Sequence, residues 1–200
     1  GTRLGNDKND NKAATLDIAA TFENNEAYED GGAIYNTFYT NNGLGKGEGV
    51  TVTGSFTSNY AHQNGGAIYN NDGSVIGNIT GDFNSNYIEA NSTSYGGAIY
   101  NADGQIVIKK SVFELNEAGD EGGAIYNEGK LDIDRYDLVT ISKGKEKHKY
   151  YNNSFSSNTA NRGGAIYNAA QMTIEDTIFT SNKANTKGGA IWNSNSLIIN

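Results

Sequence analysis

Acidic side chains are the first candidates for chemistry in this sequence, because two closely spaced carboxyl groups can hydrolyse a glycosidic bond. Hydrolysis needs the two groups about 5–5.5 Å apart for retention, or about 6.5–9.5 Å apart for inversion. Acidic pairs occur at positions 29–30, 120–121 and 175–176. Neighbouring residues on a strand point to opposite faces, so these pairs indicate solvated turn charges rather than a catalytic dyad.

Metal, phosphate and nucleophile chemistry has equally little support in the sequence. The only histidines, His62 and His148, are far apart and lack a ligand spacing. The stretch "NDKND" at 6–10 lacks the glycine and the closing glutamate of an EF-hand loop. No phosphate loop or nucleophile elbow occurs. We therefore expect no cofactor, no metal and no catalysis.

Two motifs recur six times and determine how the remaining residues are placed. The hexapeptide GGAIYN begins at 31, 65, 96, 122 and 163, and returns as GGAIWN at 188. A Phe-x-x-Asn motif precedes each copy, beginning at 22, 56, 83, 113, 155 and 179. Short alternating apolar segments, such as "LDI" at 16–18, lie between the copies. The shortest repeat is 25 residues. Three short strands per unit of that length predict an all-β parallel β-helix, a solenoid in which each lap stacks on the previous one.

Stacking explains why the same residues recur. We expect the isoleucines and phenylalanines to form inward columns, the paired glycines to form bends, and the asparagines to form hydrogen-bonded ladders. In the first two copies, the residues with these structural roles are Gly31, Gly32, Ile34, Asn36, Phe22, Asn25, Gly65, Gly66, Ile68, Phe56 and Asn59.

Alternation along each AIYN strand then places an aromatic residue on the outside of every lap. We call this set the tyrosine strip; its members are Tyr35, Tyr69, Tyr100, Tyr126, Tyr167 and Trp192. The opposite phase, with alanine and tyrosine inside, stays open. Flat amphipathic rings can stack on sugars or on a protein partner, although stacked tyrosines can also simply support one another.

A second candidate for binding is the longest insertion between motifs, at 134–151. It contains the only basic run, "KGKEKHK" at 143–149, in a chain with a net charge of −8. That acidic balance argues against nucleic acid as a partner. A solvated loop is the simpler interpretation of the run, but protruding loops often carry specificity. "YDLVTI" predicts an extra strand here, and the candidate binding residues are Arg135, Tyr136, Lys145, Lys147, His148 and Tyr150.

The alternating GGAI and Phe-x-x-Asn motifs resemble the polymorphic outer-membrane protein repeats of autotransporter passenger domains. The resemblance rests on Gly31–Ile34 and Phe22–Asn25 and on the five later pairs. It implies a right-handed, pectin-lyase-like β-helix, exported to the cell surface, that mediates attachment. The implied partners are a receptor or glycan on a host cell or a neighbouring cell.

We expect an irregular lead-in over 1–13, followed by one β-helix domain over 14–200, together a fragment of a longer chain. Any contact with a membrane is expected through regions outside this chain. The expected role is an extracellular adhesin or a stalk. The alternatives are a carbohydrate-active β-helix enzyme, favoured by clustered carboxylates in one groove, and a filament subunit that self-associates through its end laps.

Overall fold

The computed structural model describes residues 16–37, 49–89 and 93–200. The expected lead-in over 1–13 therefore lies outside the described residues. All the regular secondary structure in the described ranges is β-strand. These ranges contain no candidate membrane-spanning helix.

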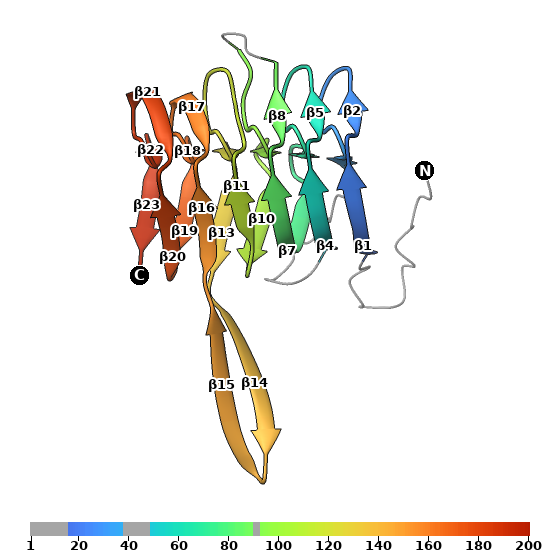
Figure 1. Cartoon of the computed structure of the whole chain (residues 1–200), viewed down its shortest axis with the longest axis vertical. Helices are drawn as coiled ribbons and strands as arrows, with labels where there is room; N and C mark the ends of the chain where they lie inside the picture. Colours follow the sequence, from blue (N-terminus) through green and yellow to red (C-terminus); the bar gives the residue numbers. More distant parts are fainter. Residues whose placement is uncertain (1–15, 38–48, 90–92) are drawn as a thin grey trace.

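The strands form three columns that run the length of a solenoid, with its laps side by side (Figure 1). The first column is a ten-stranded sheet made of β1 (Leu16–Glu23), β4 (Val50–Thr57), β7 (Val75–Asn84), β10 (Gln105–Lys109), β11 (Val112–Glu114), β13 (Lys130–Asp134), β16 (Asn153–Ser156), β19 (Gln171–Ile174), β20 (Thr177–Thr180) and β23 (Ser196–Ile199).

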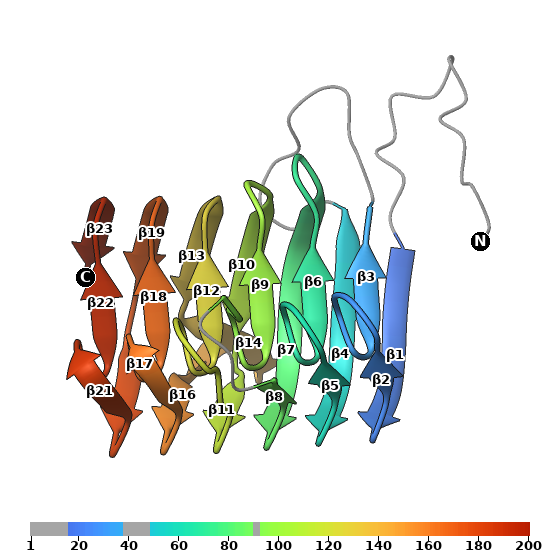
Figure 2. The same ribbon diagram turned by 90° about the horizontal axis from the view of Figure 1, so that it is seen from above.

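The other two columns are built from shorter strands. The second contains β2 (Glu26–Ala27), β5 (Tyr60–Ala61), β8 (Tyr87–Ile88), β17 (Thr159–Arg162) and β21 (Lys183–Lys187). The third contains β3 (Ile34–Asn36), β6 (Ile68–Asn70), β9 (Ile99–Asn101), β12 (Ile125–Asn127), β18 (Ile166–Asn168) and β22 (Ile191–Asn193), which lie side by side in Figure 2.

Neighbouring laps pair in parallel, and the repeated motifs pair with themselves. Ile34 lies opposite Ile68, which lies opposite Ile99, and the series continues to Ile191. Phe22 and Phe56 begin an equivalent series that ends at Phe179. The predicted parallel β-helix is therefore confirmed, with like residues in register on successive laps.

The division of each lap into strands differs from the sequence prediction. In the first three laps the apolar segment and the Phe-x-x-Asn segment form one continuous strand of 8, 8 or 10 residues. In two later laps the backbone bends between them, at Lys110 with φ 49° and at Asp176 with φ 39°. A separate second-column strand directly follows every Phe-x-x-Asn motif except that of Phe113, after which Glu117 forms only isolated bridges to the neighbouring laps.

The core lies inside the solenoid and is formed by the phenylalanine and isoleucine columns. Successive phenylalanine rings stack nearly parallel, with centroids 4.5 to 5.1 Å apart. Parallel strands lie about 4.8 Å apart, so the ring spacing matches the lap spacing. Each fully buried Phe or Ile contributes about 1.5–3 kcal/mol, and neighbouring laps share that gain.

Two asparagine ladders hold the turns. In the first, the side-chain amide of Asn116 donates to the side-chain oxygen of Asn158 at 2.9 Å and to the carbonyl oxygen of Phe83 at 3.0 Å. In the second, Asn101 donates to Asn127 and Asn127 to Asn168, each at 2.7 Å. The residue before each first-ladder asparagine has a left-handed φ of 54° to 57°. The predicted ladders are confirmed, and they satisfy polar groups that are buried between laps.

The two glycines of each motif are needed for different reasons. The first, such as Gly122, has a left-handed φ of 68°, which side chains rarely adopt. The second, such as Gly123, faces the next lap, where an added Cβ would collide with the carbonyl oxygen of Gly164. The prediction of a glycine bend is confirmed, and close approach between laps is the reason for the second glycine.

Candidate functional site

The insertion at 134–151 folds as a two-stranded antiparallel hairpin that projects away from the solenoid (Figure 1). It consists of β14 (Tyr136–Ser142) and β15 (Lys145–Tyr151), joined by Lys143 and Gly144 with φ 51° and 72°. Two successive positive φ values are typical of a type I′ turn, which matches the twist of a hairpin. The predicted strand over "YDLVTI" is confirmed. The second strand was missed because its alternation is one of charge rather than of hydrophobicity.

The base of the hairpin is held between the corners of the two neighbouring laps. On one side the ammonium group of Lys110, at the bend of the preceding lap, lies 4.5 Å from the ring centroid of Tyr151. On the other side the guanidinium group of Arg135 donates to the carboxylate of Asp176, at the bend of the following lap, at 2.9 Å. The guanidinium group also lies 4.6 Å from the ring centroid of Tyr150. These contacts fix where the hairpin leaves the solenoid.

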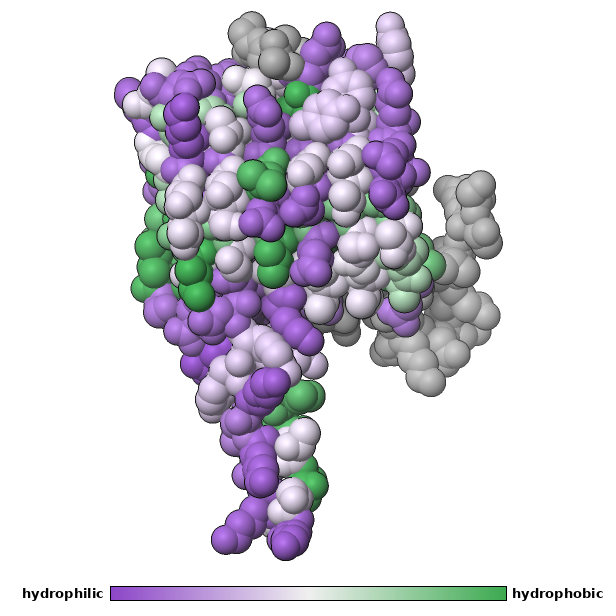
Figure 3. Space-filling model, in the orientation of Figure 1, coloured by the Kyte–Doolittle hydropathy of each residue, from purple (hydrophilic) through white to green (hydrophobic). Residues whose placement is uncertain are grey.

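The hairpin has two chemically different faces, since opposite residues of the two strands share a face. One face, the lysine face, carries Lys145, Lys147 and Lys149 opposite Ser142, Thr140 and Leu138. The other, the histidine face, carries Tyr150, His148 and Glu146 opposite Asp137, Val139 and Ile141. Figure 3 shows hydrophilic residues along one strand of the hairpin and apolar residues along the other.

Charges on the histidine face are paired within the hairpin itself. Nδ1 of His148 lies 2.7 Å from a carboxylate oxygen of Asp137, and its Nε2 lies 3.7 Å from Glu146. Ile141, near the tip, is 78% exposed. The hairpin thus brings together all six binding candidates that the sequence named in this insertion, but it divides them between its two faces and its base.

The tyrosine strip lies outside the phenylalanine and isoleucine core and forms a cluster of its own. Tyr–Tyr ring centroids are 4.9 to 5.1 Å apart, and Tyr167 and Trp192 are 4.2 Å apart. Tyr100, Tyr126 and Tyr167 are only 7–9% exposed. The rings therefore stack on one another, and in the middle laps their faces are covered. A ligand would meet ring edges and hydroxyl groups there rather than free ring faces.

Burial also controls the ionisation of the strip. It raises the pKa of Tyr69 to about 12, and burial together with the nearby Glu121 raises the pKa of Tyr167 to about 12. Tyr100 and Tyr126 are shifted further in the same direction by burial, and both donate to the carboxylate of Glu128. These tyrosines are neutral hydrogen-bond donors at physiological pH.

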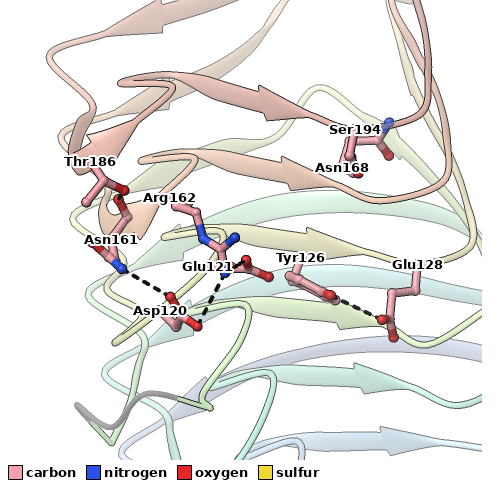
Figure 4. A network of polar contacts seen from close by, with 9 residues as sticks. All are labelled: Asp120, Glu121, Tyr126, Glu128, Asn161, Arg162, Asn168, Thr186 and Ser194. Carbon is pink, nitrogen blue, oxygen red and sulfur yellow. Dashed lines mark hydrogen bonds and ion pairs between the residues drawn. The ribbon is translucent and has the colours of Figure 1, made fainter.

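A charged network borders the strip, and it corrects one expectation. The sequence indicated solvated turn charges at 120–121, but Glu121 is only 4% exposed. Figure 4 shows Arg162 reaching toward both Asp120 and Glu121, with Asp120 at 3.7 Å. The guanidinium group lies 5.5 Å from the ring centroid of Tyr167. Burial raises the pKa of Glu121, while Arg162 acts in the opposite direction.

Other acidic and histidine side chains do not converge on one point. Asp30 pairs with Asn64, Asn64 with Tyr95 and Tyr95 with Glu121, so Asp30 and Glu121 lie three laps apart. His62 contacts Glu26 at 3.1 Å and, through its other nitrogen, Glu89 at 3.6 Å. Over the described ranges no group of three or more His, Cys, Asp or Glu side chains is arranged to hold a metal ion.

Sequence reasoning missed Glu128 and the surroundings of His62. Glu128 joins two rings of the strip through its two carboxylate oxygens. It occurs in one lap only, so no recurring pattern pointed to it. The contacts of His62 come from neighbouring laps and become evident only once Glu26, His62 and Glu89 are known to stack.

Comparison with known protein families identifies the repeat. The Chlamydia polymorphic membrane protein repeat matches the chain over residues 19–37, 53–71, 110–128, 154–169 and 176–194. Each match contains one Phe-x-x-Asn motif and one Gly-Gly motif. The lap of Phe83 and Ile99 is not among the matches; its two motifs begin 13 residues apart, against 8 or 9 elsewhere. No curated protein and no solved structure matches the chain.

Proposed function

Since the chain belongs, through its five matched repeats, to the polymorphic membrane protein repeat family, we propose that it mediates attachment at the cell surface as part of an exported passenger. The family indicates an outer-membrane or surface location. Our proposal goes further: the chain is extracellular, binds a receptor or glycan on a host or neighbouring cell, and catalyses no reaction.

The hairpin is the observation that carries this proposal. Nearly all of its residues are exposed, and among the described residues it is the one pair of strands outside the three columns. Side chains in the laps pack against equivalent residues above and below, whereas most of those in the hairpin are exposed to solvent. A rigid scaffold that presents a protruding segment is a common arrangement for recognition.

The tyrosine strip has a secondary part in the proposal. In the first lap the ring of Tyr35 stacks on Tyr69 but is 51% exposed, while the rings of the middle laps are covered by each other. The enzyme and the filament remain alternative predictions. A surface protein of this kind can act as an adhesin or as a stalk that binds no partner, and the experiment must distinguish these two roles.

A replacement of the hairpin tests the proposal. Residues 137–150 are exchanged for Asn-Gly, which joins Tyr136 to Tyr151 through a tight turn and retains the contacts of Lys110 with Tyr151 and of Arg135 with Asp176. Beads coated with the chain or with this variant are then counted on cultured cells. We expect the variant to lose most of the attachment.

The control variant Tyr35→Ala removes an exposed aromatic ring and leaves the hairpin intact. Circular dichroism and thermal unfolding establish that all three proteins are folded. Attachment that survives the hairpin replacement would reject the hairpin as the adhesive element and favour a stalk. Attachment that depends on Tyr35 instead would move the binding surface to the strip.

A further inference from the structure

The lysine face forms a regular row of positive charge. Lys145, Lys147 and Lys149 occupy alternate positions of β15 and therefore share one face. Alternate residues of a strand are about 6.8 Å apart, so the row extends over roughly 13 Å. Such spacing presents separate point charges along a line rather than one compact pocket.

These ammonium groups are not neutralised by any of the described residues. In the part of the chain that the structure describes, no carboxylate lies within ion-pair distance of Lys145, Lys147 or Lys149. Their partners across the strand pair are the uncharged Ser142, Thr140 and Leu138. By contrast, Lys130 and Arg162 pair with acids of their own or a neighbouring lap.

The row continues to the base of the hairpin. The ammonium groups of Lys149 and Lys110 lie 4.7 Å and 4.5 Å from the centroid of the Tyr151 ring. Cations near a tyrosine ring are held by its negative face, which keeps both lysines at this position. Four positive charges therefore run from the tip of the hairpin to the solenoid.

The rest of the molecule has the opposite sign. Residues 134–151 contain five cationic and three acidic residues, a net charge of +2, in a chain of −8, so the remainder carries −10. A long anionic partner is repelled by the laps and attracted by the hairpin. Exposed charges act over a Debye length of about 10 Å at 0.1 M salt. Because the hairpin projects away from the solenoid, the negative potential of the laps is screened from the positive potential of the hairpin.

We propose that the lysine face binds a linear anionic polysaccharide, one that carries sulfate or carboxylate groups along its chain. The inference rests on the proposed function, in which the hairpin is the attachment element, and it names the class of ligand. Extended polyanions match a straight row of evenly spaced charges. Each lysine ammonium group is a point charge that can donate to a sulfate or carboxylate oxygen without a fixed bidentate geometry.

An anionic membrane is a less suitable partner for this hairpin. Segments that lie on a bilayer bury apolar side chains while their basic residues reach the headgroups from the same side. Here Val139 and Ile141 lie on the histidine face, opposite to the lysines. If the lysine face contacted the headgroups, Val139 and Ile141 would point into water, and Leu138 would be the one aliphatic side chain on the same face as the lysines.

The experiment uses the full chain, with dextran sulfate and alginate as charged probes and unmodified dextran as the neutral one. The test variant is Lys145→Gln, Lys147→Gln, Lys149→Gln. The matched control loses the same charge elsewhere, through Lys46→Gln, Lys183→Gln, Lys187→Gln. A single exposed ion pair contributes little to affinity, but the test variant loses three lysines at once. We therefore expect it to bind the charged probes roughly 10- to 100-fold more weakly than the unmodified chain.

The control variant should stay within about twofold of the unmodified chain, and 0.5 M NaCl should release the probe because exposed charges are screened. Equal binding by the test variant would overturn the inference. So would equal binding to neutral dextran, or tighter binding to phosphatidylglycerol vesicles that is lost in Val139→Thr, Ile141→Thr.

The two proposals fail in different ways. If the hairpin replacement abolishes attachment to cells while the lysine variant still binds dextran sulfate normally, the attachment role stands and the ligand class is wrong. If the lysine variant loses dextran sulfate but the hairpin replacement still attaches to cells, the ligand class stands and the attachment role is wrong.

Discussion

The laps and the hairpin obey different rules, although both are built of strands. In a lap, a residue such as Phe113 or Asn116 has an identical residue above and below it, and each of them limits the space and the polar partners of the other. In the hairpin, every cross-strand pair except Tyr136 and Tyr151 joins two different residue types, as Thr140 faces Lys147. Stacking therefore favours the same residue type in successive laps, whereas a hairpin residue can change without affecting a residue of another lap.

The largest difference in stability is expected when a methyl group is added between two laps. Gly123→Ala would drive a Cβ into the carbonyl oxygen of Gly164, while the nearest atom to a Cβ at Gly189 is 3.5 Å away. We expect Gly123→Ala to lower the free energy of unfolding by about 4 kcal/mol or to prevent folding, and Gly189→Ala to change it by less than about 1 kcal/mol. Urea unfolding followed by circular dichroism measures both, and similar effects at the two positions would contradict close packing as the reason.

The asparagine ladder should give the next largest effect. Asn116→Ala removes the side-chain oxygen that accepts from the backbone N–H and the side-chain amide of Asn86, and the side-chain amide that donates to Asn158 and to the carbonyl oxygen of Phe83. Orphaned buried groups cost about 1–3 kcal/mol each, so we expect a loss near 3 kcal/mol after relaxation. The matched control is Asn25→Ala in the first lap, where the ladder ends. A loss there as large as at Asn116 would show that the turn, rather than the ladder, is what the asparagine stabilises.

The tyrosine strip predicts a loss of stability at high pH. Burial raises the pKa of Tyr69 and Tyr167 to about 12 and that of Tyr126 further, so the folded state keeps protons that the unfolded chain releases near pH 10. Stability is therefore complete below pH 10 and falls as the pH rises toward 12. Each such tyrosine adds a slope of about 1.4 kcal/mol per pH unit. Tyr126→Phe should reduce the slope measured by urea unfolding, and an unchanged slope would contradict its burial.

Replacing the hairpin should have the smallest effect on stability. The Asn-Gly exchange of 137–150 removes exposed side chains and retains Arg135, Tyr136 and Tyr151, which hold the base. We expect the free energy of unfolding to change by less than about 1 kcal/mol, as is usual for surface changes. A large drop in the thermal midpoint would show that the hairpin also stabilises the laps, and it would weaken the contrast between the two regions.

Recurring residues are what made the fold predictable. Six copies of Ile, Phe and Asn at matching positions indicated columns and ladders, and parallel pairing confirms them. Features that occur once were not predictable in the same way. The burial of Glu121 arises from its own lap and from Arg162 and Tyr167, which lie 41 and 46 residues further along the chain.

Strand boundaries were predicted less well, since residue types alone do not distinguish a continuous strand from a bent one. Leu16–Glu23 is unbroken, whereas the equivalent segment around Lys110 bends. At the site, the apolar alternation of "YDLVTI" indicated β14, but the charged alternation of β15 gave no hydrophobic signal. The covered rings of the tyrosine strip also depend on stacking distance, which a sequence does not contain.

The corner at which the hairpin leaves the solenoid has a practical consequence. The excursion at 134–151 leaves the pairing of Ile133 with Ile174 and of Phe155 with Phe179 intact. Its two ends are the directly opposed residues Tyr136 and Tyr151, about 5 Å apart for any antiparallel pair. A foreign epitope or binding peptide with closely spaced ends could therefore be grafted here, or at the equivalent corners near Lys110 and Asp176. The solenoid would then serve as a display scaffold whose insertion sites are spaced one lap apart.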